Sequence, residues 1–166
     1  MKLLQVPPLT LSCASSHAAL AAVFSPDTLR EVHGPGTHVG AFVGGRRTLC
    51  FDVDVSRVPR PIRCFFCGPR LRVTTAQTVT AAPAGLDVTN DITMHFVGSE
   101  LFAVRPTFSL RDHDGRVTVS GRVQHHARLP WPLRGIAESF MAAHSERELL
   151  KFKRVLQRRG LVAPDS

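Results

Sequence analysis

Apolar and polar residues alternate with a period of two through the middle of the chain, from residue 37 to residue 128. In the clearest stretch, residues 48–55, apolar side chains (Leu49, Phe51, Val53 and Val55) alternate with others (Cys50, Asp52 and Asp54). Such alternation puts the apolar side chains on one face of a strand and the rest on the opposite face. The pattern therefore predicts a β-sheet with one buried face and one face in water.

Turn residues interrupt this pattern about every 8 to 12 positions, which is typical of a meander of antiparallel strands. Further strands are predicted over residues 70–80, 86–97 and 101–111, and the last strand ends near Arg128. Asp114-Gly115 precedes this last strand and has the composition of a tight hairpin turn.

The chain before the alternating region predicts one strand and two short helices. Residues 9–15 predict the strand, and Ser16 can cap a helix over residues 17–24. The second helix is predicted over residues 26–32, because Ser25-Pro26-Asp27 supplies a cap, a first-turn proline and an early acid.

After residue 132 the period becomes helical and stays so to about residue 158, which makes a helix about 40 Å long at 1.5 Å per residue. Gly160 and Pro164 end it. Its apolar residues form a stripe that predicts a buried face: Leu133, Ile136, Ala137, Phe140, Met141, Ala143, Leu149, Phe152, Val155 and Leu156.

The first 22 residues also share features with targeting segments. Lys2 precedes two leucines, as in a secretory signal, and no acidic residue occurs before Asp27, as in an organellar presequence. Pro7-Pro8 breaks the apolar run, however, and no arginine occurs before Arg30. We therefore expect this segment to form the ordinary first strand and helix.

Length and composition indicate one domain with its own core. The chain has 166 residues, of which 43% are hydrophobic, so we expect a single domain over residues 1–166 with a core over about residues 9–158. It has ten Phe, one Trp and no Tyr. This composition suits the lining or filling of an interior better than base stacking.

One strand, two short helices, a run of antiparallel strands and one long helix make an α+β layout. This order resembles the helix-grip fold of the START-like superfamily, which includes Bet v 1-type allergens, polyketide cyclases and coenzyme Q-binding proteins. The resemblance covers residues 9–157, and its local carriers are the segments FSPDTLR (residues 24–30) and RLPWPLRGIAE (residues 128–138). It implies a curved antiparallel sheet of about seven strands wrapped around the C-terminal helix.

A helix lying across a curved sheet can leave an interior cavity of about 300 to 1,000 Å³ for an apolar ligand. The resemblance therefore implies non-enzymatic binding or transfer of a lipid, sterol, quinone or similar molecule. The alternative is a filled core, for which the same residues would serve equally well. The residues expected to line the cavity are Phe51, Phe96, Phe102, Phe108, Ile136, Phe140 and Met141.

The sequence indicates no catalytic or metal-binding motif. Cys64 and Cys67 have the spacing of half a zinc knuckle, but Cys13 and Cys50 are isolated, and a strand would put Cys64 and Cys67 on opposite faces. We expect no metal, no cofactor and a reducing compartment, cytoplasmic or mitochondrial. A cyclase-like or aromatase-like enzyme is a further alternative, for which the candidate polar groups are Gln77, His95, Arg105 and Glu138.

Basic residues outnumber acidic ones by 21 to 13, which gives a net charge of +8. No nucleic-acid motif accompanies this charge, so the expected partners are an anionic membrane or an acidic protein, and nucleic acid is not expected. One basic group lies in the middle hairpins (Arg46, Arg47, Arg57, Arg60, Arg63, Arg70 and Arg72). The other group lies near the end of the last helix and includes Lys153. Its remaining members are the predicted docking surface: Arg147, Lys151, Arg154, Arg158 and Arg159. These charges also suit an alternative function, an accessory subunit of a larger and possibly mitochondrial complex.

Overall fold

In the part of the chain that the structure describes, one antiparallel sheet of seven strands forms the framework, in the order β1-β7-β6-β5-β4-β3-β2. The computed structural model describes residues 1–66, 68–96 and 99–163, without the side chains of residues 95, 96 and 99. Its strands are β1 (Lys2–Leu11), β2 (His38–Val39), β3 (Arg46–Asp54), β4 (Arg70–Ala82), β5 (Gly85–Phe96), β6 (Ser99–His113) and β7 (Arg116–Ala127). Its helices are α1 (Ser16–Val23), α2 (Pro26–His33), α3 (Arg60–Arg63) and α4 (Leu133–Arg158).

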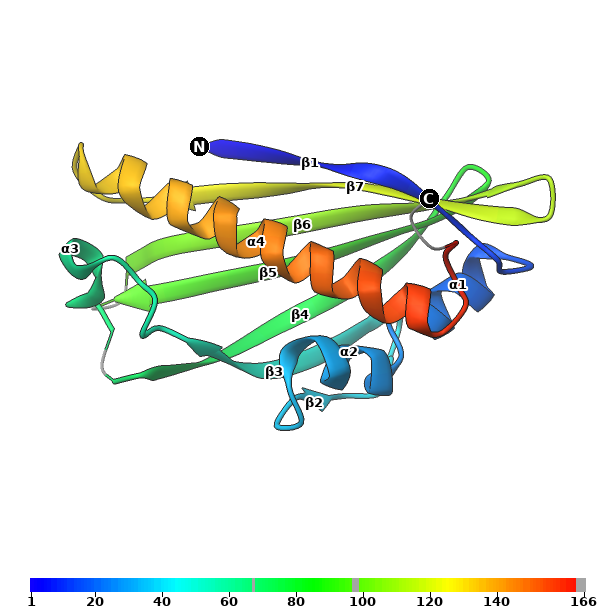
Figure 1. Cartoon of the computed structure of the whole chain (residues 1–166), viewed down its shortest axis with the longest axis horizontal. Coiled ribbons are helices and arrows are strands. Elements are labelled where there is room, and N and C mark those ends of the chain that lie inside the picture. The colour runs from blue at the N-terminus through cyan, green and yellow to red at the C-terminus, as the bar shows by residue number, and fades with distance from the viewer. Residues whose placement is uncertain (67, 97–98, 164–166) are drawn as a thin grey trace.

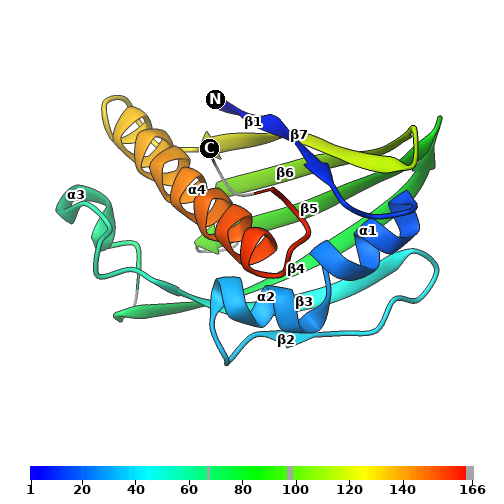
Figure 2. The same cartoon turned by 45° about the vertical axis from the view of Figure 1, so that its right-hand side comes forward.

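The long helix α4 runs across one face of the sheet (Figure 1), and the sheet curves around it (Figure 2). Helices α1 and α2 lie at the end of the sheet toward which the C-terminal part of α4 points. This is the α+β helix-grip arrangement predicted from the sequence, including the bounds of α4.

The alternation predicted for residues 48–55 is confirmed. Leu49 and Phe51 are buried, and in register they face Thr75 and Val73 of β4. The same parity places Arg47 opposite Gln77, and both side chains are buried. The inner face of β3 and β4 therefore carries two long polar side chains among its apolar ones.

The first strand was placed wrongly from the sequence, because it begins at Lys2 and ends at Leu11. Pro7 and Pro8 do not prevent the strand, since β1 is an edge strand, where a missing N–H is tolerated. They lie in the register shift between Val6 and Leu9, where the pairing with β7 is interrupted.

Two smaller features also differ from the sequence predictions. The cap of α1 is Ser15, whose hydroxyl accepts from the Ala18 N–H, while Ser16 binds the Asp112 carboxylate. Arg57, Arg60 and Arg63 lie before and within α3, which was not predicted, rather than in a hairpin.

Candidate functional site

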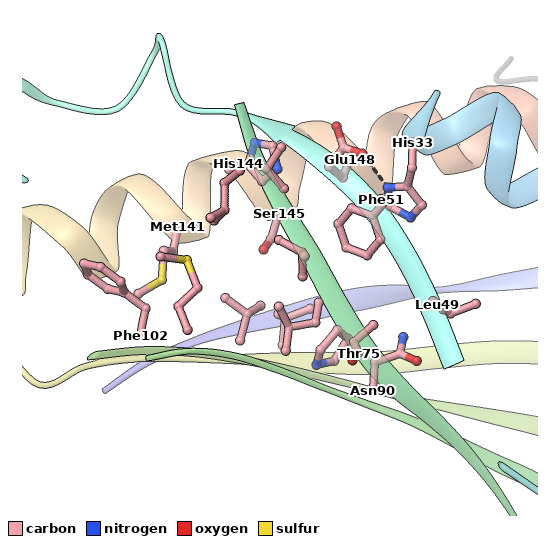
Figure 3. Close-up of a pocket in the computed structure, with 18 of the residues that line it drawn as sticks. His33, Leu49, Phe51, Thr75, Asn90, Phe102, Met141, His144, Ser145 and Glu148 are labelled. Carbon is pink, nitrogen blue, oxygen red and sulfur yellow. Dashed lines mark ion pairs between the residues drawn. The ribbon is translucent and has the colours of Figure 1, made fainter. Parts of the chain in front are cut away.

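A cavity of about 210 Å³ lies between α4 and the inner face of the sheet (Figure 3). The buried apolar residues form two separate clusters, and the cavity is lined by members of both. Phe24 and Leu49 belong to the cluster beside α1 and α2, and Phe102 and Ala137 belong to the cluster near α3. The interior between these clusters is therefore not filled by side chains.

Five of the seven residues predicted to line a cavity do line this one: Phe51, Phe102, Phe108, Phe140 and Met141. Ile136 does not, because its side chain is 37% exposed while its neighbour Ala137 takes the inward position on the helix. The side chain of Phe96 lies outside the described part of the chain.

A second hollow, of about 440 Å³, lies between β1 and α4. Phe24, Phe108, Leu149 and Phe152 line both hollows, so these side chains form the partition between them. The ring of Phe24 lies 5.8 Å from that of Phe108 and 6.0 Å from that of Phe152. Gly121 of β7 leaves space for the Phe108 ring, since a Cβ at this position would lie 2.8 Å from Cδ1 of Phe108.

On the sheet side of the cavity, the side chain of Gln77 is hydrogen-bonded to the buried Arg47. Nε of Arg47 donates to Oε1 of Gln77 at 2.8 Å, and Nη2 donates to the Phe24 carbonyl at 2.6 Å. The guanidinium lies over the Phe42 ring at 4.3 Å, and burial lowers the pKa of Arg47. Arg47, placed among the basic hairpin residues from the sequence, is therefore an interior residue that is only 6% exposed.

Among the residues that the structure describes, two buried side-chain atoms in the cavity wall have no hydrogen-bond partner within the protein. They are Nε2 of Gln77 and Oδ1 of Asn90. Gln77 and Asn90 are direct cross-strand partners on β4 and β5, and both line the cavity. Buried polar groups are nearly always paired in folded proteins, so these two atoms are exceptional.

On the helix side, Glu148 of α4 forms an ion pair with His33 of α2, with 3.2 Å between Oε2 and Nδ1 (Figure 3). The His33 ring also stacks on Phe51, at a centroid distance of 4.6 Å. Burial alone would raise the pKa of Glu148, but hydrogen bonds from His33 and Lys151 outweigh it and lower the pKa to about 2. Glu148 is therefore a carboxylate anchored at the cavity wall.

A serine and a histidine also meet beside the cavity. Oγ of Ser145, which lines the cavity, lies 2.8 Å from Nε2 of the fully buried His125, and Nδ1 of His125 lies 3.3 Å from the Lys2 carbonyl. Burial lowers the pKa of His125 and favours its neutral form. Ser145 is in the interior of α4, where backbone N–H groups already donate within the helix, so this pair gains no oxyanion-binding donors from its own backbone.

Of the three suggested polar groups whose side chains the structure describes, only Gln77 is found in the cavity wall. Arg105 is on the exposed face, where it pairs with Asp91 and Glu100. Glu138 is buried elsewhere, against the Ala127 N–H at 3.3 Å and the Met1 amino group at 3.0 Å. The side chain of His95 is outside the described residues.

The predicted docking surface is partly neutralised by ion pairs within the molecule. Arg158 and Arg159 both pair with Glu31 and connect the end of α4 to α2. Lys151 pairs with Glu148 at 2.7 Å. Arg147 and Arg154 are exposed.

Among the described residues, no group of three or more His, Cys, Asp or Glu side chains is placed to hold a metal ion. Cys64 follows α3 as its C-terminal cap, so placing it on a strand was wrong. Cys67 lies outside the described residues. No helix in the described part of the chain is both long and apolar enough to cross a membrane.

The arrangement of a curved antiparallel sheet around one long helix defines the class of this protein as a helix-grip protein with an apolar interior. Solved structures of low sequence identity share it. An aromatase/cyclase, Zhui, from a Streptomyces species matches with a TM-score of 0.56 and 11% identity, over 95% of this chain and 94% of that chain. A START superfamily protein from Mycobacterium smegmatis matches with a TM-score of 0.52 and 14% identity, over 95% of each chain.

Human STARD10 matches with a TM-score of 0.50 and 13% identity, over 90% of this chain and 63% of that chain. No protein-family model matches the sequence. A comparison with curated proteins finds no match either. The chain therefore has the fold of the START-like superfamily, as its order of elements predicted.

Proposed function

We propose that this protein binds a compact apolar molecule in the cavity between α4 and the sheet. The observation that carries the proposal is the cavity itself, which separates two apolar clusters that would otherwise form one core. Apolar cavities with a few placed polar groups are the usual sites for small ligands. The START-like fold, shared with the structures above, supports the same function.

The size of the cavity limits the ligand. At about 210 Å³ it is below the range of about 300 to 1,000 Å³ typical of pockets for drug-sized molecules. A molecule of two fused rings, or one end of a longer molecule, suits this space better than a whole phospholipid. A longer ligand would have to displace the partition and extend into the second hollow.

The two alternatives from the sequence have less support. A scaffold with a filled interior does not account for the cavity. A cyclase-like enzyme would need acid and base groups against the ligand. Glu148 and His33 bind each other, as do Ser145 and His125, which leaves His144 as the other titratable side chain that lines the cavity. In this proposal, the exposed side chains of Arg147 and Arg154 attract the ligand-bound protein to an anionic membrane.

The test is a titration of the purified protein with naphthalene, followed by its fluorescence, together with mass spectrometry of any apolar molecule that copurifies. We expect saturable binding of one naphthalene per chain. Phe140→Arg puts a charge against the cavity and should abolish this binding. Ala143→Arg is the matched control, because Ala143 is exposed on the same helix. Absence of saturable binding, or equal loss in both variants, would contradict the proposal.

A further inference from the structure

Gln77 and Asn90, which we call the amide pair, line the cavity and hold one unpaired donor and one unpaired acceptor within its wall. Gln77 is fully buried, and its Nε2 has no partner. Oδ1 of Asn90 is also buried and unpaired. Leaving a buried polar atom unpaired is unfavourable, so a site that keeps two of them side by side is suited to a group that pairs with both.

The roles of the two Gln77 atoms are fixed by its neighbour. Nε of Arg47 can only donate, and it lies 2.8 Å from Oε1 of Gln77. The other atom of this amide must therefore be the NH₂ group, a buried donor that has no partner. The positive charge of Arg47 at the oxygen end of the amide strengthens this donor.

The acceptor lies beside this donor. Gln77 and Asn90 face each other in register across β4 and β5, and the Cβ atoms of such partners are about 4.5–5.5 Å apart. Figure 3 shows Asn90 next to Thr75 on the sheet side of the cavity, with Ser145 and Glu148 on the helix side. The Thr75 hydroxyl does not donate to Asn90, because its proton is used in the bond to the Asp91 carbonyl at 2.6 Å.

We propose that the ligand of this cavity carries a hydroxyl group that accepts a hydrogen bond from Gln77 and donates one to Asn90. A hydroxyl is the smallest neutral group that does both. A ketone or quinone oxygen would satisfy Gln77 alone, and a carboxylate would place its lone pairs against the Asn90 oxygen. This inference rests on the proposed function and narrows its ligand to a compact apolar alcohol or phenol.

The test compares four probes on one ring skeleton: naphthalene, 2-naphthol, 2-methoxynaphthalene and 2-naphthoate. Burying an unpaired hydroxyl is unfavourable, so without the amide pair 2-naphthol would bind more weakly than naphthalene. With the pair, 2-naphthol should bind at least about tenfold more tightly than naphthalene and than the methyl ether, which only accepts.

A substitution tests whether the amide pair causes the preference for 2-naphthol. Asn90→Leu keeps the size of the side chain and leaves the bond between Arg47 and Gln77 intact. It should remove the preference for 2-naphthol without weakening naphthalene. The matched control is Ile92→Val, which changes the cavity wall two residues along the same strand and should alter both affinities by the same factor. Gln77→Met is a second variant, expected to lose the same preference.

The outcomes separate the two proposals. If naphthalene binds and 2-naphthol binds no more tightly, the hydroxyl inference is wrong and the proposed function stands. If 2-naphthoate binds most tightly, the charge of Arg47 selects the ligand and the inference is also wrong. If none of the four probes binds, the proposed function fails, and the inference that rests on it fails as well.

Discussion

Glu148 of α4 and His33 of α2 form an ion pair of 3.2 Å at the wall of the cavity. The pair joins the long C-terminal helix to a short helix that precedes most of the sheet in the sequence. Since both side chains are about one-fifth exposed, water screens the pair only in part. It fixes one side of the cavity, and it makes the stability of the molecule depend on pH.

Acid should weaken this connection between the helices. The pKa of Glu148 is lowered from 4.5 to about 2, so the stability it contributes is complete above pH 4.5 and is lost as the pH falls toward 2. Glu148→Gln should cost about 1–2 kcal/mol near neutral pH and flatten the decline below pH 4.5. Urea unfolding between pH 3 and pH 7 measures both effects, and parallel pH profiles for the two proteins would contradict this account.

A second loss of stability is expected at milder acidity, from buried histidines. Burial lowers the pKa of His125 from 6.5, so below pH 6.5 the unfolded chain takes up a proton that the folded chain resists. Stability therefore falls as the pH drops below 6.5. His144, whose pKa burial also lowers, acts in the same direction. His125→Gln should remove part of the slope between pH 6.5 and 5, and the double variant with His144→Gln more of it; an unchanged slope would show that neither histidine is responsible.

Removing the unpaired acceptor should stabilise the empty protein. Asn90→Leu replaces a buried oxygen that has no partner by apolar surface, and we expect the free energy of unfolding to rise by about 1–2 kcal/mol. Ile92→Val, on the same strand, should instead lower it by about 0.5–1.5 kcal/mol. Denaturant unfolding without added ligand compares the two. A fall in stability for Asn90→Leu would mean that the oxygen is paired in solution.

The partition between the two hollows should set the length of ligand that can enter. Phe152→Ala removes a ring shared by both hollows and should raise the affinity for a long-chain alcohol, such as 1-hexadecanol, relative to 2-naphthol.

Phe102→Ala is the control for this change, because Phe102 lines the first cavity alone. Either substitution should cost up to about 3–5 kcal/mol, so affinities are compared well below the unfolding temperature. A gain for the long alcohol in both variants would mean that cavity size, and not the partition, sets the limit.

The sequence predicted the sheet, the order of the elements and α4 because these depend on local periodicity. The sequence also indicated that Arg47 faces inward, because it lies on the same side of the strand as Leu49 and Phe51. We placed it on the surface because arginine is charged. Ile136 was misplaced for a related reason. Its apolar character suggested burial, whereas the packing of α4 turns Ala137, Phe140 and Met141 inward.

Contacts between distant segments could not be predicted in the same way. The pairing of Gln77 with Asn90 depends on the register of β4 and β5, and a shift of one residue would turn one of the two side chains to the other face. The pair of His33 and Glu148 depends on how α2 packs against α4. Neither spacing nor composition contains this information.

The pairing of β1 with β7 also determines when this protein can fold during its synthesis. Lys2 lies opposite His125, so the first strand emerges from the ribosome long before its partner exists. Contacts between such distant residues slow folding, because a long loop must close before they form. Until α4 has been made, the apolar inner face of the sheet has no cover. The growing chain must therefore keep that face from other apolar surfaces, and the interior can close only after α4 has been synthesised.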